Sequence, residues 1–240
     1  MSHTTLTVFT LQPGHRRWGL AQMGTSPGPL KRVAGLRFFK LMGSGAANGF
    51  GFWPNLDRYG LMAVWEDAAA AETFFERHPL WAGYRHRSAE QWTVHLAPTK
   101  AQGLWDGLNP FTADLAAASA AASPAMDTPV AVLTRASIRW RKAPRFWQFV
   151  EPTSAALAQV AGVRAAIGLG ELPLVRQATF SVWESARAMQ DYAYKDVRHR
   201  EVIQLTRREN WYGEEMFARF RVLGSTGTLD GREPLAGMLV

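Results

Sequence analysis

The sequence predicts an α+β protein in which one β-α-β-β-α-β unit occurs twice. Residues 179–211 have the pattern of a strand followed by a long helix, and residues 61–92 repeat that pattern. A Trp-Glu pair ends the strand in both copies. A Gly-x-x-Asp-Gly tail follows each unit, at residues 103–107 and 227–231. Matching features in matching order indicate an internal duplication.

The elements of the first unit follow from alternation and from turn residues. Alternating apolar side chains predict strands, and Gly and Pro mark where helices break. The strands are expected at residues 6–11, 35–42, 59–65 and 92–96, and the helices at 15–33, interrupted at 24–29, and at 66–91, interrupted at His78-Pro79.

The second unit repeats this order. Strands are expected at residues 129–139, 163–169, 175–183 and 216–223, and helices at 144–160 and 185–208. An Ala/Ser-rich stretch without large apolar residues predicts a linker at 112–128, between a half at 1–111 and a half at 129–240.

The order β-α-β-β-α-β is that of the ferredoxin-like fold. A four-stranded sheet with helices on one face leaves its other face uncovered, so two such units are expected to pack sheet to sheet. The predicted architecture is a dimeric α+β barrel fused into one chain.

Composition excludes several classes of function. The chain of 240 residues has no cysteine, which rules out disulfides, thiolate catalysis and Cys-ligated metal centres. Its net charge of +7 comes from scattered basic residues without a nucleic-acid-binding motif, so no nucleic-acid partner is expected. No apolar run could span a bilayer and no signal peptide is evident, which predicts a cytoplasmic protein with at most peripheral membrane contact.

The two copies differ at one position that bears on chemistry. Where the first copy has Trp81, the second has His199 on its long helix. His199 is either an axial metal ligand or a surface histidine that pairs with Asp196 or Glu201. A histidine together with 10 Trp and 13 Phe matches what a buried porphyrin requires, namely one axial nitrogen and an apolar surrounding.

The sequence resembles the spheroidene monooxygenase family of carotenoid-modifying oxygenases over nearly its whole length. The matching stretches are residues 21–24, 35–45, 53–55, 90–94, 133–139, 168–173, 177–183 and 214–220. The resemblance implies a haem b enzyme that activates O2 with electrons from a ferredoxin-type donor and oxygenates an apolar, carotenoid-like substrate. It also implies that His199 is the axial ligand of the haem iron.

The resemblance further implies a haem site between helix and sheet in the C-terminal half. Alternation then suggests that sheet residues on a common face form the distal pocket. These residues are Thr134, Ala136, Ala178, Phe180 and Val182. Three arginines are candidates for pairing with the haem propionates: Arg176, Arg198 and Arg207.

Two other functions stay open from sequence. The same barrel could serve a haem-dependent dehydratase or N-oxidising enzyme, with aldoxime-dehydratase-like chemistry, in which a substrate nitrogen binds iron. It could also serve a non-catalytic haem or lipophile carrier. A fused barrel can exist as a monomer, while exposed helix faces leave a homodimer as the alternative.

Overall fold

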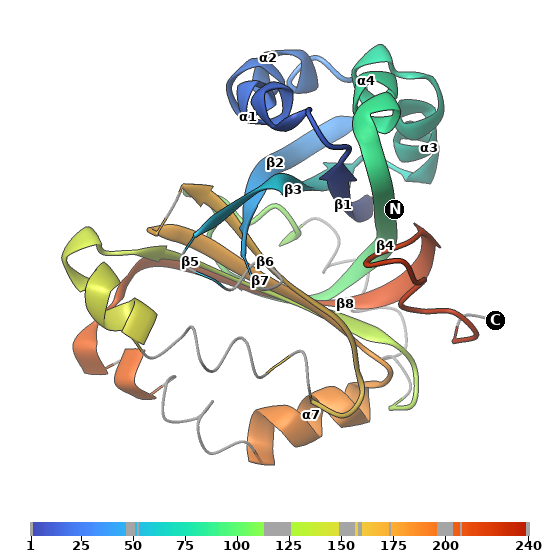
Figure 1. Cartoon of the computed structure of the whole chain (residues 1–240). Helices are drawn as coiled ribbons and strands as arrows, with labels where there is room; N and C mark the ends of the chain where they lie inside the picture. Colours follow the sequence, from blue (N-terminus) through green and yellow to red (C-terminus); the bar gives the residue numbers. More distant parts are fainter. Residues whose placement is uncertain are drawn as a thin grey trace.

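Eight strands of the described chain form one closed antiparallel barrel (Figure 1). The computed structural model describes residues 2–46, 51, 53–112, 126–148, 157, 160–172, 174–195, 204–206 and 208–238. Around the barrel the strands follow the order β1-β3-β2-β6-β7-β5-β8-β4. Their bounds are β1 His3–Leu11, β2 Leu36–Gly45, β3 Pro54–Trp65, β4 Ser88–Gly103, β5 Val130–Ile138, β6 Val163–Leu172, β7 Arg176–Trp183 and β8 Tyr212–Gly227.

The helices lie outside the barrel, on opposite sides for the two halves (Figure 1). Those of the first half are α1 Arg16–Thr25, α2 Pro27–Leu30, α3 Ala68–Arg77 and α4 Pro79–Arg87. The second half has the 3-10 turn η1 Trp140–Lys142 and helix α7 Ala186–Lys195. The predicted break at His78-Pro79 is real: the His78 side chain caps α4 by accepting a hydrogen bond from the Leu80 amide, and Pro79 occupies the first helical turn.

The two halves have the same strand order and share both edges of their sheets. The first half reads β4-β1-β3-β2 and the second β8-β5-β7-β6. Antiparallel pairing of β4 with β8 forms one seam, and a short pairing of β2 with β6 forms the other. The predicted fold class, a fused α+β barrel, is confirmed. The domain boundaries stay a prediction, because residues 113–125 of the expected linker lie outside the described residues.

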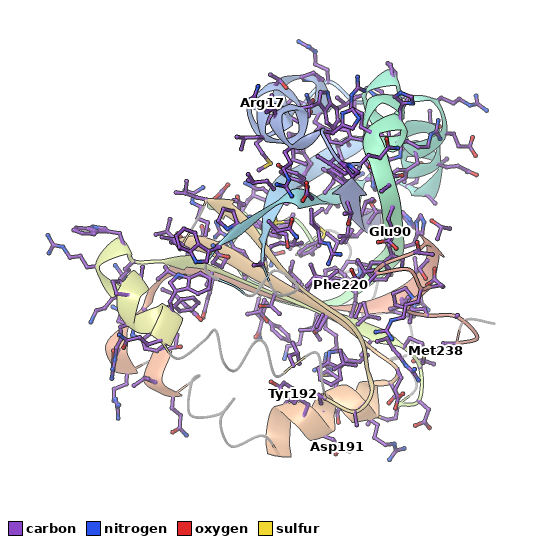
Figure 2. All side chains as sticks on the ribbon, viewed as in Figure 1. Arg17, Glu90, Asp191, Tyr192, Phe220 and Met238 are labelled. Atoms are coloured by element: carbon purple, nitrogen blue, oxygen red, sulfur yellow. The ribbon has the colours of Figure 1, made fainter. Side chains whose placement is uncertain are left out.

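Apolar side chains from both halves fill the barrel. The cluster includes Leu6 and Val94 from the first half and Phe180 and Phe220 from the second. Figure 2 places Phe220 at the centre, between the two sheets. Phe180 and Phe220 are fully buried, and truncating such a side chain to alanine typically costs about 3–5 kcal/mol. The interior is therefore a packed core.

The seam strands are longer than the sequence predicts. β4 runs to Gly103, although the pattern of alternation ends at Leu96, and β8 begins at Tyr212 rather than Met216. Pro98 obscures the continuation of β4, since proline disfavours central strands. The structure accommodates Pro98 at a register shift between Pro98 and Lys100.

The repeated tails close the two ends of the barrel. Trp105 and Leu229 from the Gly-x-x-Asp-Gly tails are buried in the interior cluster. Each tail starts at a glycine with positive φ, Gly103 at 87° and Gly227 at 83°. A Cβ at Gly103 would lie 2.1 Å from the Glu215 carbonyl oxygen, so only glycine fits there. The tail motif that repeats in the sequence is thus a structural plug.

No helix in the described part of the chain has the length and apolar character needed to cross a bilayer.

Candidate functional site

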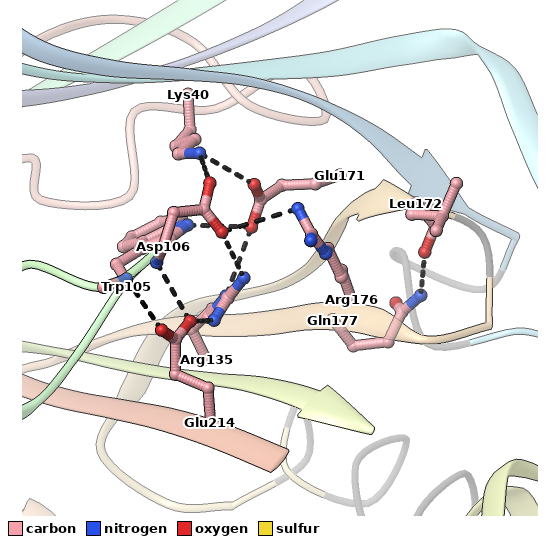
Figure 3. A network of polar contacts seen from close by, with 10 residues as sticks. Lys40, Trp105, Asp106, Arg135, Glu171, Leu172, Arg176, Gln177 and Glu214 are labelled. Carbon is pink, nitrogen blue, oxygen red and sulfur yellow. Dashed lines mark hydrogen bonds and ion pairs between the residues drawn. The ribbon is translucent and has the colours of Figure 1, made fainter. Parts of the chain in front are cut away.

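The ends of the barrel carry polar groups that are held by ion pairs. At one end lie six charged side chains, here called the end cluster: Lys40, Asp106, Arg135, Glu171, Arg176 and Glu214 (Figure 3). Arg135 is 1% exposed and pairs with all three acids of the cluster. The distances from its guanidinium to Asp106 and to Glu171 are both 3.2 Å.

Hydrogen bonds fix the acids of the end cluster further. Glu214 accepts the backbone N–H groups of Asp106 and Gly107 at 2.9 and 2.8 Å. The Trp105 indole donates to Glu171 at 2.8 Å, and Lys40 Nζ lies 3.1 Å from the same carboxylate. The three cationic side chains of the end cluster face its three carboxylates, and most of their nitrogen atoms donate a hydrogen bond to a carboxylate oxygen. The end cluster therefore closes the barrel and leaves little free charge for a ligand.

The pKa values agree with this structural role. Burial raises the pKa of Asp106, but the hydrogen bond and charge of Lys40 and the charges of Arg176 and Arg135 outweigh it and bring the pKa below its ordinary value. For Glu214, burial likewise raises the pKa, while hydrogen bonds from Gly107, Asp106 and Arg135 lower it overall. Both side chains are ionised and paired at neutral pH.

The outer faces of the two half-sheets can be compared residue by residue, because the pairing registers match. Thr7 lies between Leu61 and Thr93 in the first half. Thr134 lies in the same way between Thr179 and Phe217 in the second half. On the next strand, Leu61 pairs with Leu41, and Thr179 pairs with Gly168. We call the four outward residues of the second half, Gly168, Thr179, Thr134 and Phe217, the central row.

The two rows differ in burial. In the first half, Thr7 and Leu61 are 0% and 2% exposed. Thr7 donates to or accepts from the Thr93 hydroxyl at 2.9 Å within this buried layer. In the second half, Thr134 is exposed and Thr179 and Phe217 are half-buried. The helical layer thus covers the first sheet tightly, whereas the described part of the second layer leaves Thr134, Thr179 and Phe217 accessible and buries only Gly168 of the central row.

Side-chain size falls at four pairs of equivalent positions on the two outer faces, while Phe217 is larger than its equivalent Thr93. The registers align Phe9 with Ala136 and Tyr59 with Gln177. Phe9 and Tyr59 belong to a continuous aromatic cluster that covers the first sheet. The corresponding substitutions, together with Leu41 to Gly168 and Leu61 to Thr179, remove bulk from the second face. This thinning marks the place where the chain could hold a flat apolar group.

Apolar clusters border the central row on both sides. On one side Met189 of α7 packs with Val130 and Trp183. On the other side Phe146 packs with Ile138 and Trp211. A polyaromatic or polyene ligand over the row would therefore contact apolar walls at each end.

The five predicted sheet residues do not share a face, which corrects the expectation of one pocket wall. Thr134 and Ala136 face outward, toward the helical layer. Ala178, Phe180 and Val182 belong to the barrel interior. The reason is the register: Thr134 pairs with Thr179 and Ala136 with Gln177, and paired residues lie on the same side of a sheet. Alternation divides the residues of one strand between two faces, but it does not show which residues of the neighbouring strand lie on the same face.

Arg176 lies in the end cluster rather than on the outer face, and its pairing with a propionate stays a prediction. Arg176 has the same parity as the inward residue Ala178, and its guanidinium lies 3.4 Å from Asp106 in the end cluster. His199, Arg198 and Arg207 lie outside the described residues, so their roles stay predictions. Within the described ranges, no three His, Asp or Glu side chains gather as a metal site.

Sequence reasoning missed Gly168, Gln177, Thr179, Phe217 and Arg219 on the outer face. Arg219 stands on β8 beside Phe217, and its partly buried side chain reaches Met189 of α7. A comparison of the two copies strand by strand could have found these residues, because each replaces a residue of different size or charge in the first copy. That comparison requires the register of every strand.

Known proteins resemble this chain in sequence. It is 38% identical to spheroidene monooxygenase of Rhodobacter capsulatus, over 93% of the chain and 90% of that relative. It is 39% identical to spheroidene monooxygenase of Rubrivivax gelatinosus, over 95% of the chain and 84% of that relative. The chain belongs to the spheroidene monooxygenase family. No protein-family model matches the sequence.

Solved structures agree with the fold. An aldoxime dehydratase in complex with butyraldoxime superposes with a TM-score of 0.60 at 10% identity, covering 99% of this chain and 84% of that one. A second aldoxime dehydratase gives a TM-score of 0.57 at 11% identity, over 92% and 81% of the two chains. At such low identity the likeness shows the architecture, whereas membership of the spheroidene monooxygenase family rests on sequence.

The end cluster predicts acid sensitivity. The folded-state pKa values of Asp106 and Glu214 are lowered, so their contribution to stability is present above the unfolded-state values of 3.8 and 4.5 and is lost as pH falls through the folded-state values. The urea midpoint of the wild type should therefore fall on acidification from about pH 5 to pH 3. Asp106→Asn should be less stable at neutral pH and should lose less on acidification.

Urea unfolding followed by tryptophan fluorescence over this pH range checks the prediction. Glu72→Gln, at an exposed residue of α3, is the control and should reproduce the wild-type profile. Equal pH profiles for wild type and Asp106→Asn would show that Asp106 adds nothing to acid sensitivity.

Proposed function

We propose that the protein is a monooxygenase that uses haem b, O2 and external electrons to oxygenate a carotenoid-like substrate. Two observations support the proposal. The relatives that share more than a third of its residues are named spheroidene monooxygenase. Thr134, Thr179 and Phe217 of the central row are accessible in the second half-sheet, whereas the equivalent Thr7, Leu61 and Thr93 are buried in the first, and this contrast is the structural observation that carries the proposal.

The residues of the outer face fit a haem. A porphyrin is flat and mostly apolar, so it requires a surface without protruding side chains. Gly168 and Ala136 provide that surface in place of Leu41 and Phe9. The flanking clusters around Met189 and Phe146 would contact its rim. His199 follows α7 in the chain, and α7 packs against this same outer face, so His199 is proposed as the axial ligand.

Haem would supply the activation of O2, and the chain supplies the polar and apolar side chains around the bound groups. Thr134 and Thr179 are paired neighbours on the sheet, and their hydroxyl groups are the polar atoms offered to an oxygen substrate. Ala136 and Phe217 offer apolar surface to a polyene. The barrel interior is packed and plugged, so a long hydrocarbon is proposed to lie along the outer face.

Electrons must come from another protein in this proposal. Monooxygenation inserts one oxygen atom of O2 into a C–H bond and reduces the other to water, which consumes two electrons and two protons. The chain has no cysteine and so cannot bind an iron–sulfur cluster of the usual kind. A ferredoxin-type protein is proposed as the donor.

Haem binding is the first expected result. Protein expressed with haem supplied should co-purify with haem and show a Soret band, and His199→Ala should lose most of this band or shift it. The matched control is His86→Ala, at an exposed histidine of α4, which should leave the band unchanged. A His199→Ala spectrum identical to the wild type would remove the ligand assignment, and the absence of haem from wild type would remove the haem proposal.

Turnover is the second expected result. With a chemical reductant and a carotenoid, the haem-loaded protein should consume O2 and yield a carotenoid with an added oxygen atom, detected by mass spectrometry. Omission of either reductant or carotenoid should stop product formation. Conversion of an aldoxime to a nitrile without oxygenation of any carotenoid would instead identify a dehydratase.

The central row predicts the effect of restoring bulk. Thr179→Leu copies Leu61 of the first half and should lower haem affinity by about tenfold or more, because the branched side chain would occupy the space of the flat ligand. Its thermal unfolding midpoint in the absence of haem should equal or exceed that of wild type. Haem titration and thermal scans measure both quantities.

The control for this variant is Thr73→Leu, the same change on the exposed side of α3 in the first half. It should leave haem affinity unchanged. Wild-type affinity in Thr179→Leu would show that the ligand does not lie over the central row.

A further inference from the structure

Three cations line the outer face where β4 meets β8. Lys100 pairs with Arg219 across the seam, so the two side chains lie on the same side of the sheet. Arg221 follows two positions along β8 and has the same orientation. We call these three residues the cation strip. Arg219 is two positions from Phe217, which places the strip next to the central row.

The cation strip has no counter-ion among the described residues. The ion pairs of the described chain involve none of its three members. Like charges opposite one another across two strands are destabilising. An anion bound beside the three side chains would offset this repulsion.

Arg219 is the best-defined member of the strip. Its Nε atom is fully buried and has no hydrogen-bond partner in the described part of the chain. Among the described residues its Nη2 atom reaches the Met189 sulfur, at 3.9 Å, and a thioether is a weak acceptor. A buried charged donor without a good acceptor is costly, so this guanidinium lacks a strong partner among the described residues at the interface of sheet and helix α7.

The first half shows no such charge at equivalent positions. The registers align Arg219 with His95, and two positions further along each strand the same offset aligns Arg221 with Ala97. His95 hydrogen-bonds to His3 at 2.8 Å, and burial lowers its pKa, so it is neutral at neutral pH. Positive charge and loss of bulk therefore occur together, on the same outer face of the second half.

We infer that the cation strip binds the carboxylates of the flat cofactor over the central row, with Arg219 making the principal contact. This inference rests on the proposed haem function. A carotenoid hydrocarbon carries no charge and cannot use these cations, whereas haem carries two propionates. Arginine forms bidentate pairs with carboxylates, and Lys100 and Arg221 would complement the second carboxylate at the exposed end of the strip.

The test compares haem with its dimethyl ester, which has the same ring but no carboxylate. Wild-type protein should bind haem about 10- to 100-fold more tightly than the diester. Arg219→Met should reduce this preference about tenfold or more and change diester affinity by less than about threefold. Arg219→Lys should recover part of the preference. Absorbance titrations of the purified proteins give the dissociation constants for haem and for the diester.

Two further variants make the test decisive. Lys100→Met changes an exposed residue, so it should fold normally and should reduce the preference for haem in the same direction. Arg17→Met removes the same charge from α1, on the other side of the barrel (Figure 2), and should leave the preference unchanged.

The outcomes separate this inference from the function on which it rests. If wild type binds neither porphyrin, the haem proposal fails and the assignment of the strip fails with it. If haem binds but Arg219→Met and Lys100→Met keep the wild-type preference, or weaken both porphyrins equally, only the assignment of the strip is wrong. If these variants keep the preference yet lose sedimentation with phosphatidylglycerol vesicles, the strip binds lipid headgroups instead.

Discussion

The pairing of β4 with β8 is the interaction on which the rest of the structure depends. It joins the two half-sheets along the length of both strands and, together with the shorter contact of β2 with β6, closes the barrel. Closure removes the sheet edges that would otherwise expose unpaired backbone groups. It also turns one face of every strand into a shared core. Each half-sheet then has a single free face, on the outside of the barrel.

This constraint decides where a ligand can bind. The interior is filled by interlocking side chains from both halves, and the plugs at Trp105 and Leu229 close its ends. The end cluster around Arg135 is a set of ion pairs in which three cations face three anions. Removing one partner of a buried pair typically costs about 3–5 kcal/mol. Neither the barrel interior nor the end cluster has room for a large apolar substrate. The outer faces remain, and only the second one is incompletely covered by the described helices.

The sequence predicts the fold well, because alternation and the duplicated Trp-Glu and Asp-Gly motifs are local signals. It predicts the site less well, because a site on a sheet depends on register. Thr134 lies on the helical side, as the sequence predicts, but Phe180, which is predicted for the same pocket, lies in the barrel interior, which suits its apolar side chain equally. Arg176 looked like a free cation in the sequence, and only the fold reveals its partner Asp106. Arg219 gave no signal until its neighbours across the strands were known.

The two halves also differ in what stabilises the outer face of their sheets. The first half covers its sheet with a continuous aromatic cluster around Phe9, Tyr59 and Trp81. The second half replaces Phe9 by Ala136, and losing an aromatic side chain from a packed face typically costs about 3–5 kcal/mol. A ligand that binds only the folded protein stabilises it by mass action. A flat cofactor over the central row would restore the missing contacts and neutralise the cation strip, so the second half would depend on its ligand for stability that the first half obtains from its own side chains.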